Sequence, residues 1–211
     1  MMQIKETKRE AQRRDRRETI LRAARASFLE QGYAATTMSA IAAALGGSKT
    51  TLWTYFPSKE ELFAAVIDDA IVQFRQELLA ILDLSGGIEE TLRRFSVAIL
   101  TKMLDPDTIR LHRIIAAEAE RFPEVGRIFY ERAPRQTQER LAAYLSEAMG
   151  RGELRQADPL IAAQQLVVLL QAQHYLKRVW NVVPAVEPDE IRADVETAID
   201  TFLRAYGAPA R

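Results

Sequence analysis

Side chains suited to binding nucleic acid lie in one stretch, between Thr37 and Phe56. Four of them recur at helical spacing in its second half and would share one outward side: Lys49, Thr50, Trp53 and Thr54. Their ammonium, hydroxyl and indole groups donate hydrogen bonds, and such donors meet phosphate oxygens and base edges in protein–DNA complexes. This stretch therefore indicates a binding surface for DNA.

Two short helices are expected to position these side chains. The hydroxyl of Thr37 can cap the first helix, whose apolar face is formed by Met38, Ile41, Ala42 and Leu45. Gly46-Gly47 ends that helix, and Ser48 can cap the second, where Leu52 and Phe56 point back toward the first. This pattern predicts a helix-turn-helix whose second helix is short enough for a DNA major groove. On spacing alone, a solvated helical hairpin is the alternative.

The composition excludes several classes of site. The 211 residues contain no Cys and only two His, so disulfides, thiolate metal sites and cysteine nucleophiles are excluded and a histidine metal site is not expected. The N-terminus is charged, unlike a signal peptide, and no run of about 18 apolar residues is present to span a membrane. We therefore expect a cytoplasmic protein without a metal, a cofactor or a membrane partner.

The charge of the chain is unevenly distributed although the net charge is zero. Residues 1–60 contain 11 Lys and Arg against 6 Asp and Glu, whereas residues 61–211 contain 18 against 23. Phosphate contacts dominate the affinity of proteins for nucleic acid. A positive N-terminal part on an acidic remainder therefore favours a domain that faces DNA attached to a body that faces another partner.

The N-terminal part reads as an arm followed by three helices. Residues 1–16 are polar without an apolar face and predict a basic flexible arm. A first helix from Arg17 to Gly32 has an apolar stripe that would pack across the helix-turn-helix pair: Ile20, Leu21, Ala24 and Phe28. The predicted domains are therefore the arm, a three-helix domain over 17–60 and a larger domain over 61–211.

A long helix is expected to connect these two domains. Ser58 and Glu61 have capping-box spacing, and apolar residues continue at helical spacing from Leu62 to about Leu84. We expect this helix to be the only covalent route between the domains, so that its tilt would relay changes from one to the other.

The rest of the chain predicts further helices and no strand, so the expected fold class is all-α. Proline and glycine mark helices over about 88–103, 106–121, 123–149, 159–180 and 188–206, with Pro134 kinking or splitting the third of these. The segment from Leu160 to Trp180 is apolar nearly all round. Burial within the subunit explains that pattern, but a subunit interface fits it better, so we expect a homodimer through the last two helices.

At these positions the chain resembles the TetR/AcrR family of transcriptional regulators. The family pattern is carried by residues 42–46, AAALG, by SK at 48–49, TLW at 51–53, YF at 55–56 and SKEEL at 58–62. The resemblance covers about residues 14–70. A second segment, 113–145, resembles the AefR-like subgroup of C-terminal domains. Three positions depart from the usual pattern: Gly47, where the family commonly has Val; Thr50, where it has a small or basic residue; and Trp53, where it has Tyr.

The resemblance implies a DNA-binding domain over 17–60 and a ligand-binding and dimerisation domain over 61–211. It implies phosphate contacts by Thr37, Trp53, Tyr55 and Lys59, and places three side chains nearest the base edges: Lys49, Thr50 and Thr54. Packing beside Phe56 is an equal alternative for the ring of Tyr55. The expected partner is a palindromic double-stranded DNA operator, bound by a homodimer.

The predicted effector is a small lipophilic molecule bound in the C-terminal domain. Aromatic, sulfur-containing and a few polar side chains on the helices between 88 and 180 are the candidate contacts: Phe95, Met103, His112, Phe129, Gln171, His174 and Tyr175. Core packing is the alternative for each of them. The family most often represses and releases its operator when the effector binds, so a ligand-responsive repressor is the leading hypothesis.

Two other functions are compatible with parts of this sequence. An activator or a constitutive DNA-binding protein would have the same fold, since the sign of regulation depends on where the operator lies. An all-helical enzyme is the remote alternative, because the nearest catalytic grouping is His112 with Glu118 and Glu120, and a lone His on a helix is usually structural. We therefore predict that the protein is not an enzyme.

Overall fold

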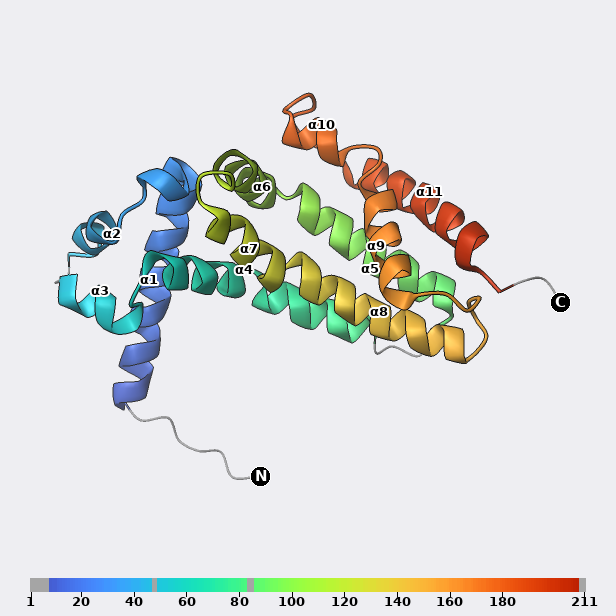
Figure 1. Cartoon of the computed structure of the whole chain (residues 1–211), viewed down its shortest axis with the longest axis horizontal. Helices are drawn as coiled ribbons and strands as arrows, with labels where there is room; N and C mark the ends of the chain where they lie inside the picture. The colour runs from blue at the N-terminus through green and yellow to red at the C-terminus, as the bar shows by residue number, and fades with distance from the viewer. Residues whose placement is uncertain (1–7, 47–48, 83–85, 209–211) are drawn as a thin grey trace. The chain divides into compact units, whose positions relative to one another are not determined.

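The computed structural model describes residues 8–46, 49–82 and 86–208, with the side chains of 49 and 50 outside the description. These residues form helices and no strand, which confirms the predicted all-α fold (Figure 1). The helices are α1 (Lys8–Ala35), α2 (Met38–Ala44), α3 (Lys49–Tyr55), α4 (Lys59–Leu82), α5 (Ile88–Leu104), α6 (Pro106–Glu118), α7 (Pro123–Arg132), α8 (Pro134–Gly150), α9 (Pro159–Leu170), α10 (Tyr175–Val179) and α11 (Pro188–Tyr206).

The chain divides into two compact units that differ from the expected domains. The first unit comprises residues 1–70 and 114–132, and the second comprises 71–113 and 133–211. The chain passes between the units at three places: within α4, within α6 and after α7. Helix α4 is therefore not the only covalent route between the units, contrary to our expectation. Residues 114–132 belong with the first unit because Phe122 packs edge-on against Tyr33 there, with ring centroids 5.6 Å apart.

Helix α1 begins earlier than the sequence indicated. It starts at Lys8, so residues 8–16, expected to be part of a flexible arm, are helical. Lys, Arg, Glu, Gln and Ala are strong helix formers, and the ion pair of Arg14 with Glu18 adds an i,i+4 contact. The predicted stop at Gly32 is a kink, with φ 83° and ψ 174°, after which Tyr33 lies in one further short turn.

The caps of the helix-turn-helix are formed as predicted where they are described. The hydroxyl of Thr37 accepts a hydrogen bond from the Ala40 N–H at 3.1 Å, and Ser58 Oγ accepts one from the Glu61 N–H at 3.1 Å. Gly46 has φ 61° at the end of α2, a backbone conformation that favours glycine. The predicted cap by Ser48 and the departure at Gly47 lie outside the described residues.

The core of the second unit is formed by α5, α8, α9 and α11, together with the end of α4. Among its side chains that are 0–1% exposed are Phe95, Leu145, Leu166 and Phe202. Pro134 splits the predicted 123–149 helix into α7 and α8 because proline lacks the N–H donor and clashes with the preceding turn. The predicted single helix over 159–180 is also divided, since α9 ends at Leu170 and α10 begins at Tyr175, with turns between them.

The apolar face of α11 is covered within its own subunit. Helix α11 packs on α5 and α9, and its apolar residues are nearly inaccessible, among them Val195, Ile199 and Phe202. The capping box of Glu187 and Glu190 and Pro188 at the first turn begin this helix. The apolar face of α11 is therefore not a surface for a partner subunit, and most of its outward residues are polar.

Candidate DNA-binding and effector-binding sites

The outward side of α3 carries the side chains expected to face DNA. Leu52 and Phe56 are only 2% and 4% exposed, so they anchor α3 on the buried side, and Ile41 of α2 is buried with them. On the opposite side Trp53 is 38% exposed and Thr54 is exposed, as the helical spacing predicted. Burial on one side and exposure on the other places these two side chains on the outward face of α3.

The other predicted DNA contacts occupy different environments. The Thr37 hydroxyl accepts the capping hydrogen bond but remains on an exposed residue, and Tyr55 is half-buried. The side chains of Lys49 and Thr50 lie outside the described residues, so their predicted base contacts stay predictions. The structure therefore brings Trp53 and Thr54 to the surface of one helix and Thr37 to the start of the preceding one.

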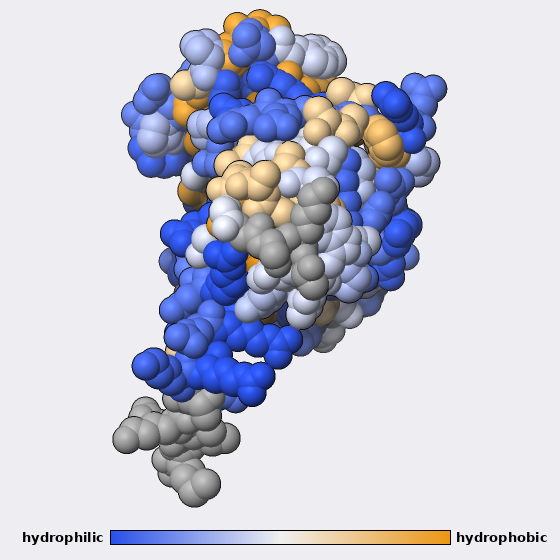
Figure 2. Space-filling view, turned by 90° about the vertical axis from the view of Figure 1, so that its left-hand side faces the viewer, coloured by the Kyte–Doolittle hydropathy of each residue, from blue (hydrophilic) through white to orange (hydrophobic). Residues whose placement is uncertain are grey.

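Arginine side chains extend along the N-terminal half of α1. Arg13, Arg14 and Arg17 are exposed, and the lower part of the surface in Figure 2 is accordingly hydrophilic. The Arg17 guanidinium also lies 5.5 Å from the centroid of the Phe56 ring, over its face. This contact connects the basic helix directly to the residue that anchors α3.

Lys59 lies against an aromatic cluster, defined here as Phe28, Tyr33, Phe63 and Phe122. Its ammonium nitrogen is 4.1 Å from the centroid of the Tyr33 ring and 5.9 Å from that of Phe122. Burial lowers the pKa of Lys59, and nearby carboxylates, first among them Glu118, oppose that shift. Lys59 is therefore partly engaged inside the unit, whereas the sequence had suggested only a phosphate contact.

The buried hydroxyl of Tyr33 lies in an acidic surrounding. Burial is the main reason why its pKa is raised, and Glu60 and Glu124 raise it further. Tyr33 is only 1% exposed and stacks on Phe28 at a centroid distance of 5.8 Å. The phenol is therefore protonated at neutral pH, and its ring serves as a fixed surface for Lys59.

A carboxylate from α6 holds the kink of α1, a contact that the sequence analysis missed. Glu118 accepts hydrogen bonds from the Tyr33 N–H at 2.9 Å and from the Ala34 N–H at 2.5 Å. The kink exposes these two N–H groups because Gly32 adopts a positive φ, and a Cβ on Gly32 would collide with Glu118 Oε1. The signal in the sequence was Gly32 itself, which we had interpreted only as a helix stop.

The grouping of His112 with Glu118 and Glu120 is not assembled as a catalytic site. Glu118 is occupied by the backbone of α1 in the first unit, while His112 belongs to the second unit. His112 Nδ1 lies 3.0 Å from the Tyr175 hydroxyl oxygen. Burial lowers the pKa of His112 to about 4, so its ring is neutral at neutral pH.

His174 precedes α10 and Tyr175 is its first residue, both in the second unit. His174 Nδ1 is 2.7 Å from Asp194 Oδ2 on α11, and burial raises the pKa of the Tyr175 hydroxyl. Next to them, Arg113 donates hydrogen bonds to the carbonyl oxygens of Val179 at 2.7 Å and Arg178 at 2.5 Å. These contacts fix α10 to α6 and α11 and bring together three of the predicted ligand residues: His112, His174 and Tyr175.

The other predicted ligand residues are dispersed. Phe95 is a core residue, and Met103 packs against the same core. Gln171 caps the end of α9 and is half-buried. Phe129 lies on α7 in the first unit, whereas the other six belong to the second unit.

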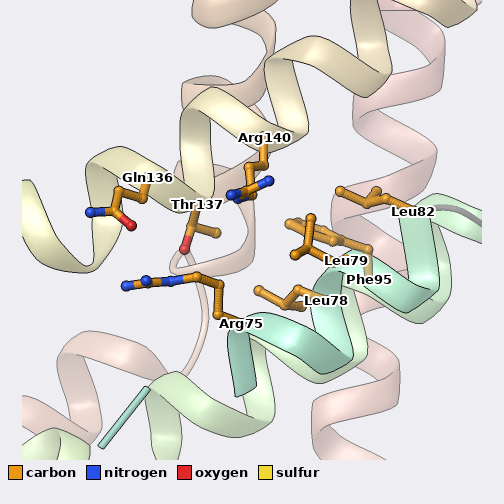
Figure 3. Close-up of a pocket in the computed structure, with 8 residues that line it drawn as sticks. All are labelled: Arg75, Leu78, Leu79, Leu82, Phe95, Gln136, Thr137 and Arg140. Carbon is orange, nitrogen blue, oxygen red and sulfur yellow. The ribbon is translucent and has the colours of Figure 1, made fainter. Parts of the chain in front are cut away.

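A small pocket opens between α4, α5 and α8 of the second unit. It encloses an empty volume of about 250 Å³, part of which is open to solvent, and its fully enclosed part has room for little more than one water molecule. Figure 3 shows the side chains that line it: Arg75, Leu78, Leu79, Leu82, Phe95, Gln136, Thr137 and Arg140. Only Phe95 was among the predicted ligand residues.

Comparison with known protein families decides the class of this chain. Residues 90–208 match the family described as AefR-like transcriptional repressor, C-terminal domain. Residues 20–66 match the family of bacterial regulatory proteins named tetR. The chain belongs to the TetR family of transcriptional regulators. Both predicted resemblances, including the AefR-like subgroup, are thereby confirmed.

Relatives of known name support the same assignment over nearly the whole chain. The structure of the flavonoid-responsive regulator FrrA is 38% identical, covers 93% of this chain and 99% of FrrA, and has a TM-score of 0.81. TtgR of Pseudomonas putida is 25% identical over 95% of this chain and 94% of its own length. SmeT, repressor of the Stenotrophomonas maltophilia multidrug efflux pump SmeDEF, is 27% identical over 92% of this chain and 91% of SmeT, with a TM-score of 0.66. A SmeT–triclosan complex is similar as well.

Membership of the TetR family makes this chain a DNA-binding transcriptional regulator, with the tetR-type region over residues 20–66. The named relatives are transcriptional regulators and not enzymes. Among the helices that the structure describes, none has the length and apolarity needed to cross a membrane. In the same described residues, no three His, Asp or Glu side chains gather as a metal site.

Proposed function

We propose that this TetR-family protein is a dimeric repressor that binds a palindromic operator and releases it when a small lipophilic effector binds. The observation that carries the proposal is α3, which buries Leu52 and Phe56 and turns Trp53 and Thr54 outward next to an arginine-rich α1. A helix presented in this way can enter a major groove while neighbouring cations meet the phosphates.

The proposed contacts follow the positions of the side chains around α3. Thr37, Trp53, Tyr55 and Lys59 are assigned to phosphates, and the base edges are assigned to three residues of α3: Lys49, Thr50 and Thr54. Among the proposed phosphate contacts, Lys59 is the one that most needs testing, because its ammonium group lies over the Tyr33 ring. A phosphate contact requires its ammonium to leave the ring or to lie between the ring and the DNA, whereas Trp53 and Thr54 already lie exposed on the outward face of α3.

The proposed dimer forms through α9, α10 and the turn after α10. Their outward side carries large apolar side chains that are 41–69% exposed: Leu160, Ile161, Val168, Leu176, Trp180 and Val182. A partner subunit that covered this stripe would remove it from water, which favours association. Helix α11, which we first expected to add an apolar surface to the dimer, has a mostly polar outward side.

The effector is proposed to bind in the second unit. The relatives support this step by their names, since FrrA is called flavonoid-responsive and SmeT forms a complex with triclosan. The second unit offers two places for the effector. One is the group of His112, His174 and Tyr175, which borders α6; the other is the pocket between α4, α5 and α8. Both α6 and α4 continue into the first unit. A ligand in either place would bias the positions of α4 or α6.

Two helices are proposed to carry the signal. Helix α6 holds His112 and Arg113 in the second unit and ends at Glu118, which binds the kink of α1 in the first. Helix α4 runs from Lys59 beside the aromatic cluster to the pocket. A ligand that prefers one arrangement of these helices weakens operator binding by the factor by which the operator weakens ligand binding.

The test begins with selection of operator DNA from random double-stranded oligonucleotides. Fluorescence anisotropy then measures affinity for the selected site at several salt concentrations. We expect a palindromic site, an affinity that falls steeply with salt, and a loss of repression in a transcription assay when a lipophilic effector is added. A transcription assay in which the bound protein raises promoter output would show an activator and would contradict the proposal.

A further inference from the structure

We propose that the first three turns of α1 bind duplex DNA outside the base pairs that α3 contacts. The contact is formed by three exposed arginines at four-residue spacing, which we call the arginine stripe: Arg9, Arg13 and Arg17. The inference rests on the proposed operator binding and adds a second stretch of DNA to it, the phosphates that flank each half-site. The stripe holds the backbone of this flank and does not read its bases.

The arginine stripe continues the side of α1 that packs inside the first unit. Six positions recur along this side at steps of three or four residues: Arg9, Arg13, Arg17, Ile20, Ala24 and Phe28. The last three are 0–2% exposed, and α1 contacts α2. The side that packs inside the unit in the second half of α1 is therefore a row of guanidinium groups in the first half.

Arg17 places the stripe next to α3. Its guanidinium lies 5.5 Å from the centroid of the Phe56 ring, and Phe56, directly after α3, is buried. At a rise of about 1.5 Å per residue, Arg9 lies about 12 Å further along the axis of α1. Figure 1 shows these turns of α1 extending beyond α2 and α3. About 12 Å is the length of three to four base pairs, so a duplex that passes α3 meets Arg9 through base pairs beyond those in contact with α3.

The stripe concentrates positive charge that α1 itself does not neutralise. Residues 8–17 contain six Lys and Arg against two Asp and Glu. Within the described part of the chain, Arg9 and Arg13 take part in no ion pair. The carboxylate of Glu18 lies 3.9 Å from Arg14, which is on another side of the helix. The stripe therefore presents its charge to a partner outside the unit.

This arrangement opposes helix stability unless an anion lies beside it. Like charges four residues apart repel each other on a helix surface, and cations in the first turn oppose the helix dipole. Lys8 and Arg9 outnumber Glu10 in the first turn of α1. A row of phosphates relieves both effects, because each guanidinium can pair with phosphate oxygens by charge-assisted hydrogen bonds. Charge complementarity and the position beside α3 together assign the stripe to the DNA backbone.

Neutralising the flanking phosphates tests the DNA side of this contact. Two duplexes carry the same selected operator, and in one of them the linkages of about four base pairs outside each half-site are uncharged methylphosphonates. We expect the wild-type protein to bind the charged duplex about a hundredfold more tightly at low salt, as measured by fluorescence anisotropy. Changing the base sequence of the charged flank should alter affinity less than about twofold, because phosphate contacts carry no base information.

Arg9→Gln and Arg13→Gln test the protein side. Glutamine has a helix propensity close to that of arginine, so each change removes the charge and leaves the helix. Each variant should bind the charged duplex about tenfold more weakly and the neutralised duplex as the wild type does. For the proposed dimer, which loses the contact in both subunits, the slope of log affinity against log salt should become shallower by about 1.8. The double variant should bind the two duplexes nearly alike.

Arg22→Gln is the matched control on the same helix. Arg22 is exposed on a different side of α1 and donates a hydrogen bond to Thr19 Oγ1 at 3.3 Å. This change should leave the affinity for both duplexes and the salt slope as in the wild type. Circular dichroism should show unchanged melting for all three variants, since each side chain is exposed. Melting lowered by several degrees in Arg9→Gln or Arg13→Gln would give the stripe a structural role and overturn the proposal.

The outcomes separate this inference from the proposed function. Equal wild-type affinity for the charged and the neutralised duplex, or unchanged binding in Arg9→Gln and Arg13→Gln, would overturn the flanking contact and leave operator recognition by α3 in place. Equal losses in Arg13→Gln and Arg22→Gln would show a general effect of net charge and would also overturn it. Failure to select any duplex from the random pool would contradict the proposed function and, with it, the flanking contact.

Discussion

The two units of the chain are stabilised by different kinds of contact. The second unit has a large apolar core to which α4, α5, α8, α9 and α11 contribute. The least exposed side chains of this core are aliphatic or Phe. The first unit has a small aromatic cluster with charged groups at its edge, where Lys59 lies over Tyr33 and Glu118 binds backbone N–H groups. Apolar packing changes little with small rotations, whereas hydrogen bonds depend on angle and distance.

This difference indicates which unit can change conformation when a single contact is lost. We expect the second unit to move as a rigid body, because the close packing of its extended apolar core resists partial rearrangement. In the first unit a single carboxylate holds the kink of α1 and a cation lies over a ring beside it, so the loss of one such contact can change the tilt of α1. Variants that break the core of the second unit should therefore unfold protein, and variants at the edge of the first unit should alter DNA binding.

The largest effect is expected from Phe202→Ala on α11. Phe202 is 0% exposed and its ring stacks on Tyr206 at 4.8 Å, so truncation leaves a cavity in the core. Loss of a buried Phe lowers the free energy of unfolding by about 3–5 kcal/mol. Thermal unfolding followed by circular dichroism measures the change.

Val168→Ala provides the control for this variant. Val168 is 65% exposed on α9, so the monomer should lose less than about 0.5 kcal/mol. Sedimentation of this variant also tests the proposed dimer surface, because the proposal expects weaker self-association. A Phe202→Ala protein that melted with the wild type would show that the second unit does not depend on its apolar core.

The next effect is expected from Gly32→Ala at the kink of α1. A Cβ there would collide with the Glu118 carboxylate, and the backbone conformation, φ 83° and ψ 174°, is almost confined to glycine. Strain and the lost charge-assisted hydrogen bonds together should lower stability by about 3 kcal/mol and weaken operator binding. Denaturant unfolding and anisotropy with operator DNA measure the two changes.

Gly46→Ala separates backbone strain from the contact with Glu118. Gly46 also has a positive φ, 61°, but a Cβ there would meet nothing within 4 Å. It should therefore lose about 1 kcal/mol from strain alone. Glu118→Gln keeps glycine at the kink and removes only the charge, so equal effects of Gly32→Ala and Gly46→Ala with a silent Glu118→Gln would contradict the role assigned to the carboxylate.

A smaller effect is expected from the titration of His112 in the second unit. Its folded pKa, about 4, lies below the usual value of about 6.5, so the unfolded chain takes up the proton first as the pH falls. The free energy of unfolding should therefore decrease as the pH falls from about 6.5 toward 4, by about 2 kcal/mol between pH 7 and pH 5. Denaturant titrations of the wild type and His112→Asn across this range measure it.

The variant His112→Asn removes the titrating ring. It should be less stable than the wild type at pH 7, since it loses the contact with the Tyr175 hydroxyl, but its stability should vary less between pH 7 and pH 5. A pH dependence that persisted in His112→Asn would assign the titration to another group. No charged contact of the first unit is needed for this effect, so it reports the second unit alone.

Local patterns allowed the DNA-binding part to be predicted in detail. Helix α2, the Thr37 cap and the buried pair Leu52 and Phe56 all follow from spacing and capping chemistry over 20 neighbouring residues. The same reasoning found the ends of α5 and α11. Arg-rich helix formation over 8–16 was missed because an amphipathic stripe was required there, although helix propensity and ion pairs suffice for an exposed helix.

Contacts between distant parts of the chain were not predictable in this way. Glu118 meets Tyr33 across 85 positions of sequence, and no spacing rule joins them. The pocket depends on Arg75 and Arg140 from two helices, whereas the sequence analysis chose aromatic residues by type and so selected core residues such as Phe95. The break between α9 and α10 has no proline or glycine to mark it.

The smallest effect on stability is expected from Trp53→Ala. This variant tests most directly whether a side chain of the first unit can affect DNA binding without affecting folding. Trp53 is 38% exposed on α3, so its removal takes little apolar surface out of a core and should change the free energy of unfolding by less than about 0.5–1 kcal/mol. Operator affinity should fall about tenfold, as for loss of one good contact to DNA.

The control Leu52→Ala truncates the neighbouring side chain on the buried side of the same helix. Leu52 is 2% exposed, so this variant should lose about 2–5 kcal/mol of stability and should lose DNA binding only in so far as α3 unfolds. Circular dichroism and anisotropy on the two variants separate folding from recognition within a single turn. If Trp53→Ala melts as early as Leu52→Ala, the indole belongs to the core of the first unit, and the proposed DNA surface loses its largest side chain.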